Sequence, residues 1–165
     1  MTDREYEARV ARQIAQYATA PLHDAPPIYE YRSNTYLRPK LNAVFGVDSM
    51  TAFYAEHILR RVAVTPEPIT RILSLGAGDA ELEVEVAQHL LSRGLVTFRL
   101  ECIELSSVLI ERANRRIRDA GLSSQVSVIQ SDLNSWSAAN RSERHYAAVL
   151  ANYILHHVVE LERLF

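Results

Sequence analysis

Apolar runs and helically spaced apolar positions alternate over the second half of the chain. Four short runs have the length and apolar content of buried strands. They span residues 71–75, 97–104, 125–130 and 146–151. Between the first three runs, apolar side chains recur at helical spacing, which predicts helices over residues 80–93 and 106–120. Strands that alternate with helices predict an α/β fold with a parallel sheet.

This region, residues 69–165, ends with two less regular stretches. Residues 131–144 are polar and predict a loop. Apolar side chains after Leu155 predict a last amphipathic helix that continues to Phe165. The run at 146–151 would then form an unprotected edge of the sheet. We expect a fragment of a longer enzyme, a chain completed by another polypeptide, or a chain that self-associates along this strand.

The first 68 residues follow a different pattern and predict a helical cap on that domain. Apolar positions over residues 6–17 predict a first helix, with Thr2 and Glu5 at the spacing of a capping box. Prolines interrupt the segment that follows. A further helix is expected to begin near Asp48 or Ser49, since either residue can cap a helix N-terminus.

The composition is that of one globular domain. The 165 residues carry a net charge of −2, so no basic surface predicts nucleic-acid binding. No apolar run reaches the roughly 18 residues that cross a bilayer. Cys102 is the only cysteine, which excludes an internal disulfide and fits a reducing compartment. We therefore expect a cytoplasmic protein with no nucleic-acid or membrane partner and no bound metal.

Polar or glycine residues follow all four predicted strands. Gly76 and Gly78 follow the first strand, and Glu104 ends the second. Asp132 follows the third strand, and Asn152 follows the fourth. Because ligands of parallel sheets bind beyond the carboxyl ends of the strands, we expect these residues to surround one site.

The turn after the first strand predicts a nucleotide-like ligand, because glycines let a ligand approach the backbone next to a helix N-terminus. Glu81 occupies the third glycine position of the dinucleotide fingerprint, so that fingerprint is incomplete. Glu83 and Glu85 also belong to the start of this helix, where we expect them on a solvated face. Three acids disfavour a pyrophosphate and favour a ligand with an amino group or a positively charged sulfur.

The acids at the next two strand ends each allow two interpretations. Glu104 could accept hydrogen bonds from both hydroxyls of a ribose, or it could be a solvated acid. Asp132 could accept a bond from an adenine amine, or it could cap a turn. Leu105 and Leu133 could pack on either side of a flat base, or they could belong to the core.

Taken together, these motifs resemble the class I S-adenosylmethionine-dependent methyltransferases. Ser74 to Ala80, read SLGAGDA, resembles the family's first motif, an acid followed by three alternating glycines. Glu104 matches the acid that ends the second strand, and Asp132 matches the aspartate after the third. ANYILHHVVELERLF, from residue 151 to 165, resembles the fourth motif of the small-molecule branch. The resemblance implies a Rossmann-like parallel sheet of about four strands, in the order 3-2-1-4, with flanking helices.

The resemblance also implies S-adenosylmethionine as the cofactor and a role for each position. Gly76 and Gly78 would lie against the methionine moiety, and Glu104 would hold the ribose. Asp132 would accept from the adenine amine, and Asn152 would contact the edge of the methionine portion. The residues predicted to bind the cofactor are Gly76, Ala77, Gly78, Asp79, Glu104, Leu105, Asp132, Leu133 and Asn152.

The chain departs from the family pattern at two positions. Ser74 replaces the acid and Ala80 replaces the third glycine, so Asp79 is the candidate that would recognise the methionine ammonium. For the acceptor, His156 is the predicted catalytic base, with His157 as its alternative. Each histidine could instead pack in a helix or face solvent.

The predicted function is methyl transfer from S-adenosylmethionine to a small-molecule acceptor. The alternative is a non-catalytic, methyltransferase-like subunit that binds a partner chain through the open sheet edge. An NAD-dependent oxidoreductase is a third possibility, which Glu81 disfavours. The tyrosines and arginines of residues 29–38 could form a lid over the cofactor, or could pack the helical cap onto the sheet.

Overall fold

A computed structural model describes residues 5–6, 8–9, 11–12, 14–15, 27–136, 146–159 and 161–163. Thr2, Val10 and Tyr17, on which the expected first helix depends, lie outside the described residues. None of the helices in the described ranges combines the length and apolar character needed to cross a bilayer.

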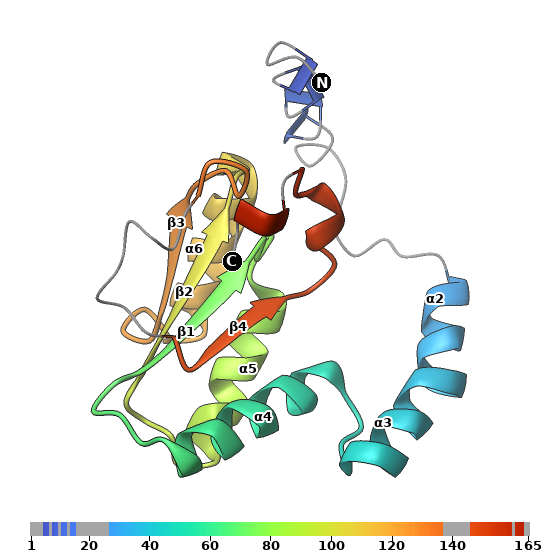
Figure 1. Ribbon diagram of the computed structural model, residues 1–165, viewed down its shortest axis with the longest axis vertical. Helices are drawn as coiled ribbons and strands as arrows, with labels where there is room; N and C mark the ends of the chain where they lie inside the picture. The colour runs from blue at the N-terminus through green and yellow to red at the C-terminus, as the bar shows by residue number, and fades with distance from the viewer. Residues whose placement is uncertain are drawn as a thin grey trace.

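Four strands form one parallel sheet in the order β3-β2-β1-β4 (Figure 1). They are β1 (Thr70–Leu75), β2 (Phe98–Glu104), β3 (Val126–Gln130) and β4 (Ala148–Ala151). Leu75 pairs with Ile103 on one side and with Ala151 on the other, and Ile103 pairs with Ile129. The carboxyl ends of the strands are therefore level at one edge of the sheet. The predicted fold class and strand order are confirmed.

Three long helices complete the layer on one side of the sheet. They are α4 (Met50–Val64), α5 (Glu81–Ser92) and α6 (Ser107–Asp119). Ser49 caps α4, because its side chain accepts a bond of 3.1 Å from the amide of Ala52. Ser106 caps α6 in the same way, through the amide of Leu109. The predicted starts of both helices are confirmed.

The two faces of the sheet are covered differently. In Figure 1 the strands lie in front of α5 and α6. Ile72 and Leu100 point to this helical face, where they join Ile58 of α4 and Leu90 of α5 in the larger buried cluster. On the opposite face the buried cluster consists of Leu73, Leu75 and Ile103, with partly buried side chains of the C-terminal segment against it. Since α4 contributes to the larger cluster, it packs with the sheet although it precedes residue 69.

Where it is described, up to Arg163, the C-terminal segment does not form the helix predicted from Leu155 to Phe165. The described residues contain two short 3₁₀ turns instead, Leu155–His157 and Leu161–Arg163. Val158 has extended backbone angles (φ −82°, ψ 124°). The amide of Val159 donates to Oδ1 of Asn134 at 2.6 Å, so this amide bonds a distant loop rather than a helical carbonyl. A tertiary contact therefore overrides the helical spacing.

Strand β4 is shorter than the apolar run that predicted it. It begins at Ala148 rather than at Tyr146. The hydroxyl of Tyr146 donates to Oε2 of Glu101 at 2.8 Å, which anchors the residue beside β2. Among the described strands β4 pairs with β1 alone, and Val149 on it is 45% exposed. Pairing of a further chain with this edge stays a prediction.

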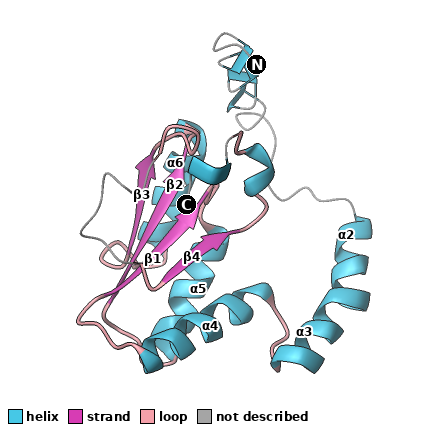
Figure 2. Cartoon of the chain, viewed as in Figure 1, coloured by secondary structure: helices cyan, strands magenta, loops and turns pink. Residues whose placement is uncertain are grey.

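A helical arm precedes α4 and stands away from the sheet (Figure 2). It consists of α2 (Pro27–Arg32), the π-helical stretch η1 (Ser33–Leu37) and α3 (Arg38–Phe45). Leu41 is its one buried side chain. Most of the segment therefore neither packs on the sheet nor covers the strand ends. Tyr29 is the exception, because it lines the cavity described next.

Candidate functional site

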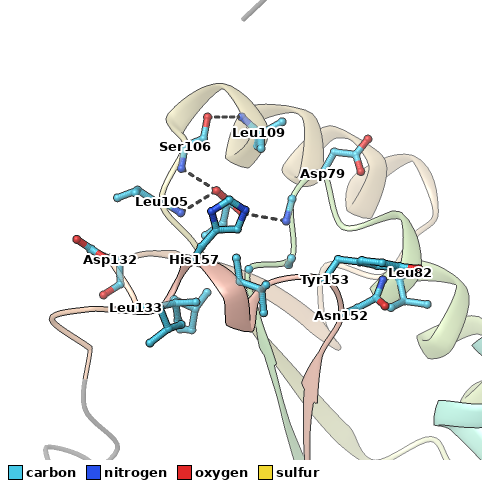
Figure 3. Close-up of a pocket in the computed structure, with 18 of the residues that line it drawn as sticks. Asp79, Leu82, Leu105, Ser106, Leu109, Asp132, Leu133, Asn152, Tyr153 and His157 are labelled. Carbon is cyan, nitrogen blue, oxygen red and sulfur yellow. Dashed lines mark hydrogen bonds between the residues drawn. The ribbon is translucent and has the colours of Figure 1, made fainter. Parts of the chain in front are cut away.

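A cavity of about 710 Å³ lies beyond the carboxyl ends of the strands (Figure 3). The loops after β1, β2, β3 and β4 all contribute to its wall. All nine residues predicted to contact the cofactor line it. The structure thus brings the predicted strand-end residues together around one cavity, and their role in binding a cofactor stays a prediction.

The turn after β1 requires glycine at its first position. Gly76 has φ +64°, and a Cβ built there would lie 2.2 Å from Cγ1 of Ile154. The amide of Gly76 donates to the carbonyl of Ile103 at 2.8 Å, which holds the turn against β2. The loop after β4 therefore packs directly on the glycine turn.

Ala80 occupies a position that glycine would fill without strain. It is the N-cap of α5, with φ +60° and ψ 29°, and it is fully buried. The left-handed region costs a non-glycine residue about 1 kcal/mol or more. The turn thus keeps the geometry expected of a third glycine although an alanine stands there.

Glu104 connects the turn after β1 to the start of α6. Its Oε2 accepts a bond of 2.9 Å from the amide of Gly78. Its Oε1 accepts bonds of 2.8 Å from the amides of Leu105 and Ser106, drawn as dashed lines in Figure 3. Glu104 is therefore a bonded acid on the cavity wall, and the interpretation as a solvated acid is wrong.

Asp132 both caps a turn and faces the cavity. Its Oδ1 accepts from the amide of Asn134 at 2.9 Å, which is the turn that its position predicted. Its Oδ2 accepts from the hydroxyl of Tyr6 at 2.6 Å. Burial, followed by this bond to Asp132, raises the pKa of Tyr6 to about 12. Tyr6 is 126 residues away in the chain, and no local pattern could have predicted its place in the site.

Asp79 is paired within the protein. Its Oδ2 lies 2.6 Å from Nη2 of Arg116 on α6. Because this guanidinium already neutralises the carboxylate, Asp79 is poorly suited to recognise a ligand ammonium. Its predicted role in replacing the acid at Ser74 is not supported by this geometry.

Glu83 is the acid that sequence reasoning placed wrongly. It was expected on a solvated face of α5, yet it is 3% exposed and lines the cavity. Its Oε1 accepts from Oγ of Ser74 at 2.6 Å, while Oε2 is buried without a hydrogen-bond partner. Burial is the main cause that raises the pKa of Glu83 to about 7. By contrast, Glu85 is exposed as expected and accepts a bond from Thr51.

The histidine on the cavity wall is His157, not His156. His157 is partly buried and lines the cavity, whereas His156 is exposed and does not contribute to the wall. The two rings lie 4.0 Å apart between their centroids. Because the last helix is replaced by a 3₁₀ turn, the turn and not a helical face decides which ring points inward. The geometry therefore moves the candidate base from His156 to His157.

The cavity wall is strongly acidic. Its described carboxylates are Asp79, Glu81, Glu83, Glu85, Glu104 and Asp132. Arg9 is the one arginine among the described lining residues, and Arg116 neutralises Asp79 from outside the wall. Such a surface repels phosphates and attracts a cationic ligand.

The chain is similar to solved structures of S-adenosylmethionine-dependent methyltransferases. One from Geobacter sulfurreducens, in complex with S-adenosyl-L-homocysteine, is 24% identical, with a TM-score of 0.36 over 50% of this chain and 31% of its own. One from Thiobacillus denitrificans, with the same ligand, is 23% identical, with a TM-score of 0.36 over 69% and 40%. A protein from Methanococcus maripaludis assigned as such an enzyme is 12% identical, with a TM-score of 0.47 over 76% and 55%.

The fold itself is α/β and Rossmann-like, with a parallel sheet in the order β3-β2-β1-β4. At these identities the likeness concerns the fold alone. The chain spans between 31% and 55% of the length of the three structures. Neither a protein-family model nor a curated protein sequence matches it.

Proposed function

We propose that this chain binds S-adenosylmethionine in the cavity and serves the transfer of its methyl group to a small-molecule acceptor. The observation that carries the proposal is the bond between Glu104 and Gly78. It joins an acid at the end of β2 to the glycine turn of β1, on the wall of a cavity of about 710 Å³. That volume is ordinary for a site that holds a small organic ligand.

The residues on the wall fit the adenosine part of the cofactor. A carboxylate can accept about four hydrogen bonds, and Glu104 accepts three from the backbone, so it can accept one ribose hydroxyl without losing them. Asp132 would accept from the adenine amine, in competition with Tyr6 or beside it. Leu105 and Leu133 would contact the base.

The acidic cavity wall is complementary to the positive charge on the sulfur of the cofactor. S-adenosylmethionine supplies a methyl group on a positively charged sulfur, which is the reactive chemistry of the site. The protein's contribution is to align the acceptor and to exclude water. Gly76 and Asn152, which both line the cavity, would contact the methionine portion.

His157 would receive a proton from the acceptor. Its pKa is lowered below the ordinary value, first by burial and then by the charges of His156 and Arg9. The ring is therefore mainly neutral at pH 7 and able to act as a base. The size of the cavity supports an acceptor that is a small molecule.

Calorimetric titration tests the proposal. Wild-type protein should bind S-adenosylmethionine and S-adenosylhomocysteine, and should bind NADH weakly or not at all. Glu104→Ala should weaken the binding of both adenosyl ligands by about 1–3 kcal/mol, since a partly buried acceptor of a ribose hydroxyl is lost. Glu111→Ala, an exposed acid on α6, is the matched control and should bind like wild type. Tighter binding of NADH than of either adenosyl ligand would overturn the proposal.

A further inference from the structure

The carboxylate of Glu83 has one oxygen in use and one without a partner. Oε1 accepts from the hydroxyl of Ser74 on β1. Oε2 is buried and bonds to no described residue. The side chain nevertheless belongs to the cavity wall and is 3% exposed. An unpaired buried acceptor costs free energy, so a donor supplied by a ligand would stabilise this arrangement.

Among the described residues, the groups that shift the pKa of this carboxylate include no cation. Asp79 and Glu104 are acids that raise the pKa of Glu83 further. Cys102 of β2 and Tyr54 of α4 are neutral groups that its charge affects in turn. Ionised Glu83 therefore has no positive partner within the described part of the chain, and the complementary ligand group is a cation that can donate hydrogen bonds.

We propose that Oε2 of Glu83 accepts a hydrogen bond from the α-ammonium group of the cofactor's methionine portion. This inference rests on the proposed function. Ser74 holds the position where the resembled family carries an acid, and its hydroxyl orients an acid from α5 instead. The sulfonium has no N–H to donate, whereas an ammonium has three donors for an acceptor such as Oε2. Glu83 thus supplies from the helix the negative charge that β1 lacks.

Three ligands separate this role from other roles of Glu83. S-adenosylmethionine carries both sulfonium and ammonium, S-adenosylhomocysteine carries only the ammonium, and 5′-methylthioadenosine carries neither. Glu83→Gln should weaken the first two by about tenfold to hundredfold and leave 5′-methylthioadenosine unchanged. Glu111→Gln is the matched control and should change none of the three affinities.

The other outcomes are distinct. Equal losses for all three ligands would show that Glu83 only shapes the site, and a loss for S-adenosylmethionine alone would assign it to the sulfonium. Either result, or no loss at all, overturns the inference. If wild-type protein binds none of the three ligands, the proposed function itself fails.

A second measurement needs no substitution at Glu83. Wild-type affinity for S-adenosylhomocysteine should rise several-fold from pH 6 to pH 7.5, because Glu83 ionises over this range. Affinity for 5′-methylthioadenosine should not follow it, although Asp79, Glu104, Cys102 and Tyr54 surround the same carboxylate. Ser74→Ala, which removes the orienting hydroxyl, should weaken the homocysteine ligand and spare 5′-methylthioadenosine. Parallel pH profiles for the two ligands would contradict the inference.

Discussion

The two faces of the sheet differ in how they are covered. The helical face buries Ile72, Leu100 and Leu90 in a continuous apolar cluster beneath α4, α5 and α6. The opposite face buries Leu73, Leu75 and Ile103, and its described cover consists of the loop after β3 and a C-terminal segment of short 3₁₀ turns. The difference indicates that the stability of the described domain resides mainly on the helical face.

The cavity lies where the two faces meet at the strand ends. Glu83 reaches it from the helical face, and Ile154 reaches it from the opposite face. Substitutions within the layers should therefore change the free energy of unfolding, while substitutions at the strand ends should change ligand affinity as well. Three comparisons between variants test whether stability and ligand affinity separate in this way.

The largest effect is expected for the core of the helical face. Leu90→Ala should lower the free energy of unfolding by about 2–5 kcal/mol, because Leu90 is fully buried and its removal leaves a cavity. Val149→Ala on β4 should cost about 0.5 kcal/mol or less, because Val149 is 45% exposed. Urea unfolding of both variants provides the measurement. Similar losses would mean that β4 is covered in solution, for example by another chain.

The next effect is a dependence of stability on pH. Folding raises the pKa of Glu83 from 4.5 to about 7, so its charged form is disfavoured in the folded protein. The Glu83 contribution is fully present below pH 4.5 and is lost as the pH rises through 7. The change amounts to at most roughly 3 kcal/mol.

Unfolding at pH 5 and pH 8 measures this contribution. Glu83→Gln should remove it, so the variant should lose less stability than wild type between the two values. Glu111→Gln should keep the wild-type dependence. If Glu83→Gln and wild type change in parallel, Glu83 is not the buried acid that the structure describes.

A smaller loss of stability is expected from substitution of Gly76, whose turn packs against Ile154 of the loop after β4. Gly76→Ala should destabilise the fold by about 1–3 kcal/mol, because its Cβ would meet Ile154 and its φ is positive. In the Ile154→Ala background the same substitution should cost less, because Cγ1 and Cδ1 of Ile154 are removed. The remaining cost should come from the backbone angle and from the Cβ of residue 154, 2.9 Å away. Additive losses in the double-mutant cycle would contradict the contact.

The strands could be predicted from sequence because each is a short apolar run that ends in a distinctive polar residue or glycine. Their order was implied by the resemblance to the methyltransferase family. The gathering of Gly78, Glu104 and Asp132 followed from the geometry of parallel sheets. Glu83 could not be placed, because the pattern of alternating acids after Gly78 suggests solvent. In its buried position it accepts a hydrogen bond from the hydroxyl of Ser74, nine positions earlier on another element.

The structure of the C-terminal segment and the position of Tyr6 could not be predicted either, because both depend on contacts between distant parts of the chain. The amide of Val159 bonds Asn134, 25 residues away, and this contact outweighs a helical pattern. The bond from Tyr6 to Asp132 spans most of the chain. Sequence periodicity indicates which face of an element is apolar, but it does not predict single polar contacts between distant segments.

The most direct test of the central claim is a map of backbone amide shifts on titration with S-adenosylhomocysteine. The account predicts saturable shifts at the carboxyl ends of the strands, at Gly78, Leu105, Ser106 and Asn134. The amides at the amino ends, such as those of Phe98 and Val126, should remain unchanged. Shifts at the amino ends, or none at Gly78 and Ser106 under saturating ligand, would contradict it.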